Sequence, residues 1–164
     1  MPDSPIIIRE AKREDGPVLL DFIRKIATFD DTLSSVEATE QKLVNQLFGS
    51  HPAAFVLFAE IDGQIVGYAL YFLTFSSFLA RPGIWLDDLY VDEKDRGLGV
   101  GQSLLTHLAK IAQERGYGRI EWVTSDDNAK ALTFYQRNGA KVRNTERVLR
   151  LDGPAISRLA ETNF

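Results

Sequence analysis

The 164-residue sequence contains no cysteine, only two histidines and one methionine. The absence of cysteine excludes disulfide bonds, cysteine-ligated metal sites and a cysteine nucleophile, and it fits a cytoplasmic location. His51 precedes a proline, and His107 is expected near the polar edge of a helix. Two scattered histidines make neither a metal site nor a serine triad, and the Gly-x-Ser-x-Gly motif is absent, so we predict no metal.

The sequence also lacks a long apolar run and an excess of basic residues. We therefore expect no membrane-spanning segment, and the first residues predict no secretory signal. The 19 basic and 23 acidic residues give a net charge of -4, which argues against a nucleic-acid partner. The hydrophobic content of 45% and the charged content of 26% are ordinary for a soluble globular protein. The length predicts a single domain over residues 1–164.

Hydrophobic periodicity predicts an α/β chain with a mixed sheet. The expected strands cover residues 6–9, 54–61, 65–75, 82–91, 119–124, 141–143 and 146–151. The expected helices cover residues 14–29, 39–48, 102–115 and 128–137, and a short terminal helix begins at Gly153. Asp62 and Gly63 predict a tight hairpin between the second and third strands.

A glycine-rich stretch, Arg-Gly-Leu-Gly-Val-Gly at residues 96–101, separates an expected strand from an expected helix. Such a turn offers bare backbone amides and the positive end of a helix dipole, which together bind anions, most often phosphate. Gly101 is not followed by the lysine of a P-loop, and neither register of the dinucleotide fingerprint ends on a small residue. The spacing that remains is Arg-x-x-Gly-x-Gly, from Arg96 to Gly101. The alternative is a turn that only needs glycine for positive φ angles.

Two consecutive carboxylates, Asp87 and Asp88, interrupt a strand that is otherwise apolar and aromatic. Burying both without partners is costly. In a regular strand they face opposite sides, so both can line one cleft only at a β-bulge. The alternative is that one or both are solvated at the strand end.

The helix expected at residues 128–137 places Asn128, Ala131 and Tyr135 on one face. Ala131 is small, and the other two carry polar groups at either end of the face. Taken alone, this pattern favours Asn128 as an N-cap and Tyr135 as a core residue.

Residues 84–101 together with residues 128–140 resemble the core of the GNAT acyltransferases, which hold acetyl-CoA. Within that family, the chain is most similar to the diamine (spermidine/spermine) and thialysine acetyltransferases over nearly its whole length. This closer similarity is carried by Arg9 and by residues 27–30, 69–72, 86–91 and 134–140.

The resemblance implies the GNAT fold, a mixed and mostly antiparallel sheet flanked by helices, with a splayed parallel pair at residues 86–91 and 119–124. The pantetheine arm of acetyl-CoA would lie in the gap, where it satisfies unpaired backbone groups. The cofactor-binding residues implied in this way are Leu89, Tyr90, Val91, Arg96, Gly97, Leu98, Gly99, Val100, Gly101, Gln102, Asn128, Ala131 and Tyr135.

The resemblance further implies an acetyl-CoA-dependent N-acetyltransferase that acts on a small primary amine in a ternary complex, usually as a homodimer. Because most of a primary amine with a pKa of about 10.4 is protonated at neutral pH, a carboxylate must accept its surplus proton. Asp87 matches the family glutamate in this role, with a water relay because aspartate is shorter, and Tyr135 matches the general acid. The substrate-binding residues implied are Phe29, Asp30, Asp87, Asp88, Glu121, Trp122 and Val123.

At one position the chain departs from the family pattern. Arg147 stands where diamine acetyltransferases carry an acidic residue, although a one-residue shift would place Glu146 there. An arginine favours an amino-carboxylate acceptor such as lysine or thialysine over a long polyamine. A protein or peptide N-acetyltransferase and a non-catalytic acyl-CoA-binding module are the alternative functions.

Overall fold

The computed structural model describes residues 4–162, and the chain divides into two compact units, one ending at Val123 and the other beginning at Thr124. The strands of the first unit are β1 (Ile7–Glu10), β2 (Phe55–Ile61), β3 (Gln64–Ser76), β4 (Arg81–Val91) and β5 (Ile120–Glu121). Its helices are α1 (Gly16–Phe29), α2 (Glu40–Leu47) and α3 (Val100–Glu114), with 3-10 turns at Arg13–Asp15, Leu33–Ser35 and Glu93–Asp95. The second unit holds α4 (Ala129–Arg137) and α5 (Gly153–Ala160).

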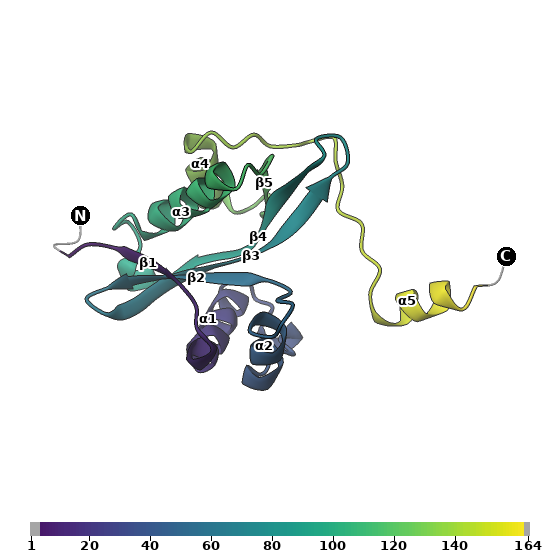
Figure 1. Cartoon of the computed structure of the whole chain (residues 1–164), viewed down its shortest axis with the longest axis horizontal. Helices are drawn as coiled ribbons and strands as arrows, with labels where there is room; N and C mark the ends of the chain where they lie inside the picture. The colour runs from purple at the N-terminus through teal and green to yellow at the C-terminus, as the bar shows by residue number, and fades with distance from the viewer. Residues whose placement is uncertain (1–3, 163–164) are drawn as a thin grey trace. The chain divides into compact units, whose positions relative to one another are not determined.

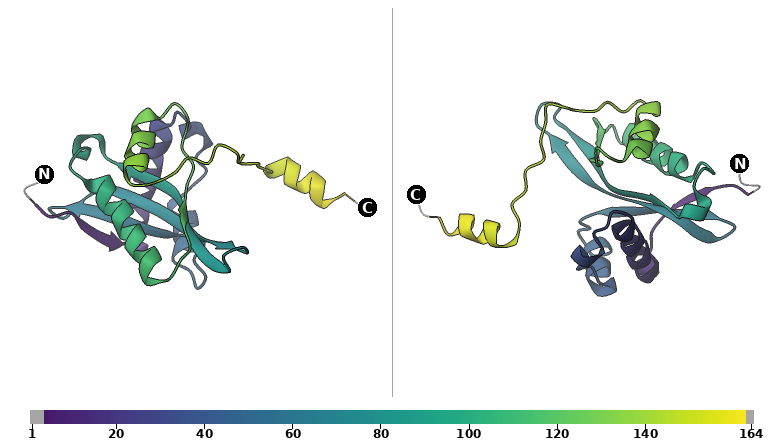
Figure 2. Two further views of the ribbon diagram at one scale, coloured as in Figure 1. Left: turned by 90° about the horizontal axis from the view of Figure 1, so that it is seen from above. Right: turned by 180° about the vertical axis from the view of Figure 1, so that it is seen from behind.

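The five strands form one sheet in the order β1-β2-β3-β4-β5. The first three pairings are antiparallel, and β4 pairs with β5 in parallel. The prediction of a mixed, mostly antiparallel sheet with one parallel pair is confirmed. Helices α1 and α2 lie on one face of this sheet and α3 lies on the other (Figure 1; Figure 2, right).

The core between α1 and the sheet is built from aromatic rings. Phe22 of α1 lies with its ring centroid 6.3 Å from that of Phe58 and 5.6 Å from that of Tyr68. Leu19 joins them and is fully buried. This packing fixes the first half of α1 against β3, which carries Tyr68.

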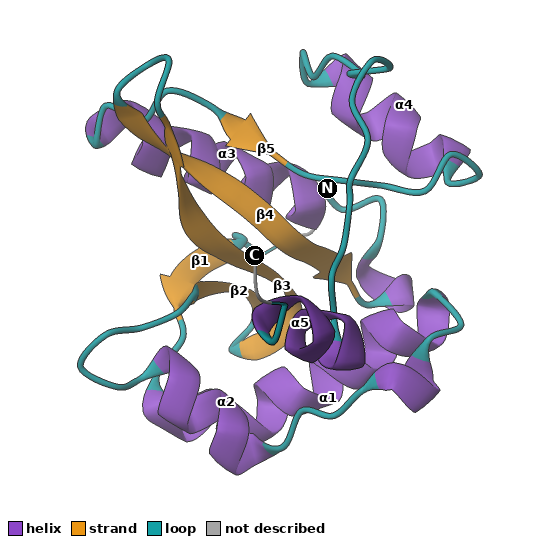
Figure 3. Cartoon of the chain, turned by 90° about the vertical axis from the view of Figure 1, so that its right-hand side faces the viewer, coloured by secondary structure: helices purple, strands orange, loops and turns teal. Residues whose placement is uncertain are grey.

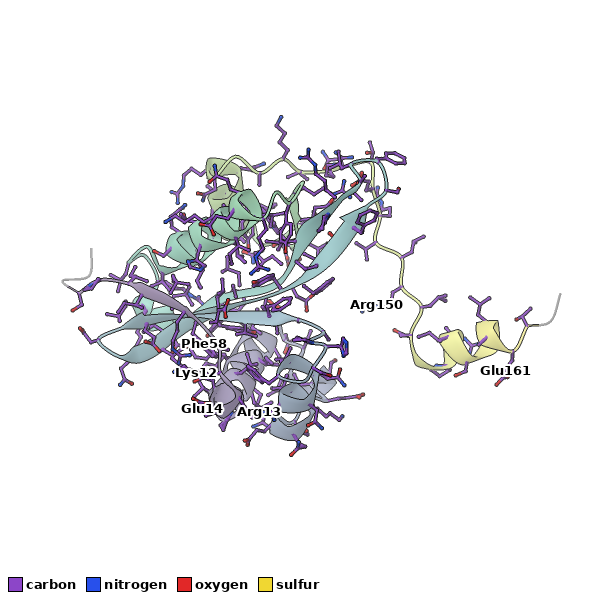
Figure 4. All side chains as sticks on the ribbon, viewed as in Figure 1. Lys12, Arg13, Glu14, Phe58, Arg150 and Glu161 are labelled. Atoms are coloured by element: carbon purple, nitrogen blue, oxygen red, sulfur yellow. The ribbon has the colours of Figure 1, made fainter. Side chains whose placement is uncertain are left out.

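An ion cluster fastens β1 to its neighbours. Arg9 donates to Glu60 of β2 through Nε at 2.6 Å and to Asp15 through Nη1 at 2.7 Å. Its guanidinium also lies 5.5 Å from the ring centroid of Phe58. Figure 4 shows the side chains of the chain, with Phe58 and the turn residues Lys12, Arg13 and Glu14 among those labelled. The Arg9 guanidinium holds the pKa of Asp15 below its usual value.

Several element bounds differ from the predictions by a few residues. The helix predicted from residue 102 begins at Val100, since Gly99 already acts as its N-cap. The helix predicted from Thr39 begins at Glu40, because the Thr39 side chain caps the helix by accepting from the Lys42 amide. The strand predicted over residues 119–124 is a strand only at Ile120–Glu121.

The final pair of strands predicted at residues 141–143 and 146–151 is wrong. Within residues 124–162 the structure forms helices, turns and loop but no strand, as Figure 3 shows for the stretch between α4 and α5. The alternating pattern is present in the sequence, but Val148 and Leu149 are 70% and 91% exposed. A strand requires a partner edge as well as a pattern, and the described part of the chain supplies none here.

Candidate active site

A β-bulge in β4 sets the position of the two adjacent carboxylates. Leu70 of β3 pairs with Asp88, and the next residue, Tyr71, pairs with Leu86. Asp87 is therefore the extra residue, without a pairing partner on β3. The bulge breaks the strict alternation that would send the side chains of Asp87 and Asp88 to opposite faces. The bulge that both side chains would need in order to line one cleft is therefore present.

Asp88 is the more buried of the two carboxylates, and its partner is a tyrosine that the sequence did not single out. The Tyr68 hydroxyl donates a hydrogen bond to Asp88 Oδ2 at 2.8 Å. The pKa of Asp88 is raised to about 6, chiefly by burial; the hydrogen bond from Tyr68 lowers it, and the negative charges of Asp87 and Asp30 raise it. A carboxyl group with this pKa changes charge close to neutral pH, as a proton-transfer group must.

The end of α1 contributes further predicted substrate-binding residues. Phe29 is the last residue of α1 and is 53% exposed, and Asp30 is the exposed C-cap. Because Asp30 acts electrostatically on Asp88, these acidic groups concentrate negative charge at one place. Asp87 is exposed to solvent, so an incoming ligand can reach it.

The outer edge of β4 is largely unpaired. β5 pairs only with Ile84 and Trp85, whereas β4 continues to Val91. The predicted parallel pair is present but short, and residues 86–91 of β4 have no strand partner on this edge in the described chain. Leu89, Tyr90 and Val91 lie on this stretch, immediately after Asp88. An amide-bearing chain could pair with their backbone groups.

The loop that follows β4 ends in an open helix N-terminus. Gly97 and Gly99 have φ angles of 80° and 90°, in the left-handed region that favours glycine. The first helical bond runs from the Ser103 amide to the Gly99 carbonyl at 2.9 Å, so the amides of Val100, Gly101 and Gln102 precede it. A Cβ at Gly97 would meet no atom within 4 Å. Leu98 completes this predicted pyrophosphate loop, which has the free amides and the open space that an anion requires.

Arg96 faces two aromatic rings beside the loop. Its guanidinium lies 5.0 Å from the ring centroid of Phe29 and 5.5 Å from that of Tyr90. Its Nε donates to the Val91 carbonyl at 3.0 Å. Arg96 therefore connects the predicted cofactor loop with the end of α1.

The predicted acceptor residues at β5 differ in their surroundings. Glu121 forms an ion pair with Arg119 at 2.8 Å, so its charge is already compensated. Trp122 is partly buried and Val123 is exposed. Glu121 thus has an ion-pair partner within its own segment.

In the second unit, Asn128 is the N-cap of α4, and its Oδ1 accepts from the Ala131 amide at 3.2 Å. The capping interpretation of Asn128 is thus confirmed, and its contact with a cofactor stays a prediction. Tyr135 is partly buried on α4, and burial raises the pKa of its hydroxyl. A raised pKa keeps that hydroxyl protonated at neutral pH, as a proton donor requires.

Arg147 and Glu146 interact within their own segment. Arg147 Nη1 donates to the carbonyls of Asn144 and Glu146, each at 3.0 Å. Glu146 forms an ion pair with Arg143. Neither side chain stands apart as an isolated charge.

Two kinds of feature are absent from residues 4–162. No helix among them is long and apolar enough to cross a membrane. No cluster of three or more histidine, aspartate or glutamate side chains that could hold a metal ion is found among them.

Tyr68 and Arg9 are the functional or structural residues whose roles the sequence did not reveal. The signal for Tyr68 exists only once the register is known, because Tyr68 pairs with Tyr90 and so lies diagonally across from Asp88. In the sequence, Arg9 contributed only to the family resemblance. In the structure, it forms ion pairs with Asp15 and Glu60.

Comparisons with known proteins agree with this geometry. A thialysine N-epsilon-acetyltransferase of Sus scrofa is 32% identical over 168 residues, covering 96% of this chain and 98% of the relative. An L-ornithine N5-acetyltransferase of Arabidopsis thaliana is 29% identical, covering 96% and 89%. The solved structure of an integron cassette protein from the mobile metagenome of V. cholerae superposes with a TM-score of 0.79 at 26% identity, covering 96% of this chain and 98% of that one.

The model of the acetyltransferase (GNAT) family matches residues 20–140, which include the β4 bulge, the glycine loop and α4. The match covers most of the chain and both motifs on which the family resemblance rests. The chain belongs to the GNAT family of acetyltransferases.

Proposed function

We propose that this protein transfers an acetyl group from acetyl-CoA to a primary amine of a small molecule by direct attack within a ternary complex. The observation that carries the proposal is the arrangement of β4. Asp87 and Asp88 at the bulge are followed at once by the unpaired edge of Leu89–Val91 and then by the open N-terminus of α3. One strand thus carries a proton acceptor and, next to it, a backbone edge that could bind a long amide-bearing thioester.

Residues of β4 and the following loop would hold acetyl-CoA. The backbone of Leu89, Tyr90 and Val91 would pair with the pantetheine arm, and the amides of residues 97–102 would bind the pyrophosphate. Arg96, Asn128, Ala131 and Tyr135 complete the set of proposed cofactor contacts. When bound, acetyl-CoA supplies the thioester carbonyl carbon that the amine nitrogen attacks, with release of the thiol.

The chain's own groups manage the protons. An ammonium has no lone pair, so the acceptor must first lose a proton, which Asp87 receives directly or through water. Asp88 and Asp30 add the negative charge that attracts the ammonium, and Phe29 provides an apolar wall beside it. Glu121, Trp122 and Val123 are the proposed contacts on the β5 side. Tyr135, held protonated by its raised pKa, donates the proton that the leaving sulfur takes up.

We propose amino acids with a terminal amine as the preferred acceptors. Both relatives named above carry such a substrate in their names, thialysine in one case and ornithine in the other. Arg147 supports this choice, since a guanidinium attracts the carboxylate of an amino acid and repels the second ammonium of a diamine or polyamine. Arg147→Glu should therefore raise kcat/KM for diamines relative to kcat/KM for lysine-like acceptors.

The proposal includes one working domain, a homodimer and a cytoplasmic location. The family match spans the division between the two units, which supports a single functional domain over residues 1–164.

A homodimer would bury apolar side chains that are exposed in the single chain, namely Val148, Leu149, Leu151, Ile156 and Leu159. Sedimentation of the wild type and of Leu149→Asp tests the dimer.

A thiol-release screen tests the function. Acetyl-CoA is offered with ornithine, lysine, thialysine, diamines, polyamines and lysine-containing peptides, and free thiol is followed. The proposal expects turnover with the small amines, best with the amino acids. Turnover with peptides alone would favour a protein N-acetyltransferase, and binding of acetyl-CoA without turnover of any amine would favour a non-catalytic module.

A further inference from the structure

We propose that Tyr68 is a positioning residue for amine acetylation, because its hydroxyl keeps the Asp88 carboxylate ionised and fixed in orientation for the acceptor ammonium. The inference rests on the proposed function, in which the carboxylates at the β4 bulge receive the amine. Tyr68 itself would touch neither substrate.

The hydroxyl of Tyr68 is not needed to fill space. The Tyr68 side chain is 0% exposed, and its ring packs 5.6 Å from the ring of Phe22 in the core under α1. A phenylalanine would make the same ring contacts. Burying a hydroxyl group is unfavourable unless it is hydrogen-bonded, so its presence here calls for a partner. That partner is Asp88, at 2.8 Å.

The register of the sheet directs this contact. Tyr68 pairs with Tyr90 and Leu70 pairs with Asp88, so Tyr68 lies diagonally across from Asp88 on one face of the ladder. Both residues belong to regular stretches of strand on the same side of the bulge. The donor is therefore held by the backbone of β3 and by the packed core, and it does not depend on a flexible loop.

Among the groups that act on Asp88, only Tyr68 favours the ionised carboxylate. Asp87 on the same strand and Asp30 at the end of α1 oppose it by charge, and burial opposes it by removing water. In residues 4–162 no lysine or arginine forms an ion pair with Asp88. Without the hydroxyl, every remaining influence would favour the protonated form.

The protonation state of Asp88 decides whether an amine can be held. An ionised carboxylate attracts the acceptor ammonium and accepts its hydrogen bonds, whereas a protonated carboxyl group does neither well. Loss of the Tyr68 hydroxyl should therefore weaken amine binding in the neutral range, where wild-type Asp88 is mostly ionised. At higher pH the variant Asp88 ionises too, and binding should return.

The test compares Tyr68→Phe with Tyr71→Phe. Tyr71 lies on the same strand and is also buried, at 6% exposed. Its ring centroid lies 5.4 Å from that of Phe55, and the hydrogen bond to Asp88 comes from Tyr68 and not from Tyr71. For Tyr68→Phe we expect kcat/KM for the amine to fall about threefold near pH 6.5 and to recover near pH 9, which corresponds to a rise of the Asp88 pKa by about one unit from about 6. The KM for acetyl-CoA should not change, and Tyr71→Phe should keep the wild-type profile.

A second measurement needs no substrate. Carbon-13 NMR of labelled aspartate, with the Asp88 signal assigned from Asp88→Asn, follows the carboxyl titration in the wild type and in both tyrosine variants. We expect the Asp88 pKa to rise by about one unit in Tyr68→Phe and to stay unchanged in Tyr71→Phe. If the wild type acetylates no amine, the proposed function fails, and the titration still decides the role of Tyr68.

Two results would overturn the inference. One is an equal Asp88 pKa in the wild type and Tyr68→Phe. The other is a loss of activity in Tyr68→Phe that is the same at every pH, because a merely structural role for the hydroxyl would produce it. In an Asp88→Asn background, Tyr68→Phe should not weaken binding of the amine any further at any pH.

Discussion

The guanidinium of Arg96 lies 5.0 Å from the ring centroid of Phe29, and it joins the loop before α3 to the end of α1. The proposed function assigns these two segments to different ligands, the loop to acetyl-CoA and the helix end to the amine. We expect Phe29→Ala to reduce the affinity for both ligands by about two- to fivefold, which is the contribution of a partly exposed cation–π contact. Calorimetry with coenzyme A and the KM for the amine measure the two effects.

Leu33→Ala is the matched control, because Leu33 is a similarly exposed apolar residue just beyond α1. It should change neither value. A Phe29→Ala protein that binds coenzyme A as well as the wild type would show that the ring contact does not support the loop.

The left-handed backbone at Gly97 gives a second prediction. Gly97→Ala meets no steric obstacle, but an alanine at a φ of 80° is strained by about 1 to 2 kcal/mol. The strain should shift the loop and reduce the affinity for coenzyme A by about five- to thirtyfold, because about 1.4 kcal/mol corresponds to a factor of ten in affinity. Calorimetric titration with coenzyme A gives the affinity.

Gly116→Ala separates strain from binding. Gly116 follows the other end of α3, also has a positive φ, of 67°, and also has open space around its Cβ position. Its substitution should lower stability by a similar amount and leave coenzyme A affinity intact. Equal losses of affinity in the two variants would mean that the loop amides hold no ligand.

Asp88 should make the fold less stable at neutral pH than at mildly acidic pH. Its folded-state pKa of about 6 lies above the ordinary value, so the folded state resists ionisation. The penalty is absent below about pH 4, grows through pH 6 and is complete above it. Asp88→Asn should therefore raise the free energy of unfolding at pH 8 by about 1 to 3 kcal/mol and abolish activity. Urea unfolding at a series of pH values measures this, and a destabilised Asp88→Asn protein at pH 8 would contradict it.

Arg9 should stabilise the fold through Asp15 and Glu60. Arg9→Met keeps much of the apolar stem but leaves two partly buried carboxylates without their cation, which should cost about 1 to 3 kcal/mol. Because the pKa of Asp15 is lowered by folding, this stabilisation is present above about pH 4 and is lost as the pH falls further. The wild type and Arg9→Met should converge in stability toward pH 3, whereas a constant difference would exclude the ion cluster as its source.

Tyr135→Phe should slow acetyl transfer far more than it weakens acetyl-CoA binding. The proposed donor is lost while the ring that packs on α4 remains, so kcat should fall about 100-fold, within the range of general acid catalysis. Single-turnover rates and a binding titration separate the two steps. Wild-type turnover in Tyr135→Phe would remove the assigned role.

The sequence was sufficient where local chemistry decides the structure. Asp62 and Gly63 adopt φ angles of 51° and 74°, as the predicted hairpin turn requires, and Gly99 takes the left-handed conformation at the start of α3. These features depend on a few neighbouring residues. The family resemblance then supplied the mostly antiparallel character of the sheet and its one parallel pair, which local patterns alone do not determine.

The features that the sequence did not predict depend on contacts between residues that are distant in the sequence. The bulge at Asp87 and the bond from Tyr68 to Asp88 follow from the register of β3 against β4, which no single segment encodes. The pattern at residues 141–151 predicted strands for the opposite reason, because it satisfies a local rule while the described structure offers no edge to pair with. Local periodicity thus predicted an element correctly where the fold supplies it with a partner, and wrongly at residues 141–151, where the described structure supplies none.

The most direct measurement is the product balance for the best acceptor found in the thiol-release screen. Wild-type protein, acetyl-CoA and the amine are incubated together, and free thiol and N-acetylated amine are quantified in the same samples by mass spectrometry. The account predicts equal amounts of both products, and almost no thiol when the amine is omitted. Thiol release that is independent of the amine, or an absence of acetylated amine, would contradict it.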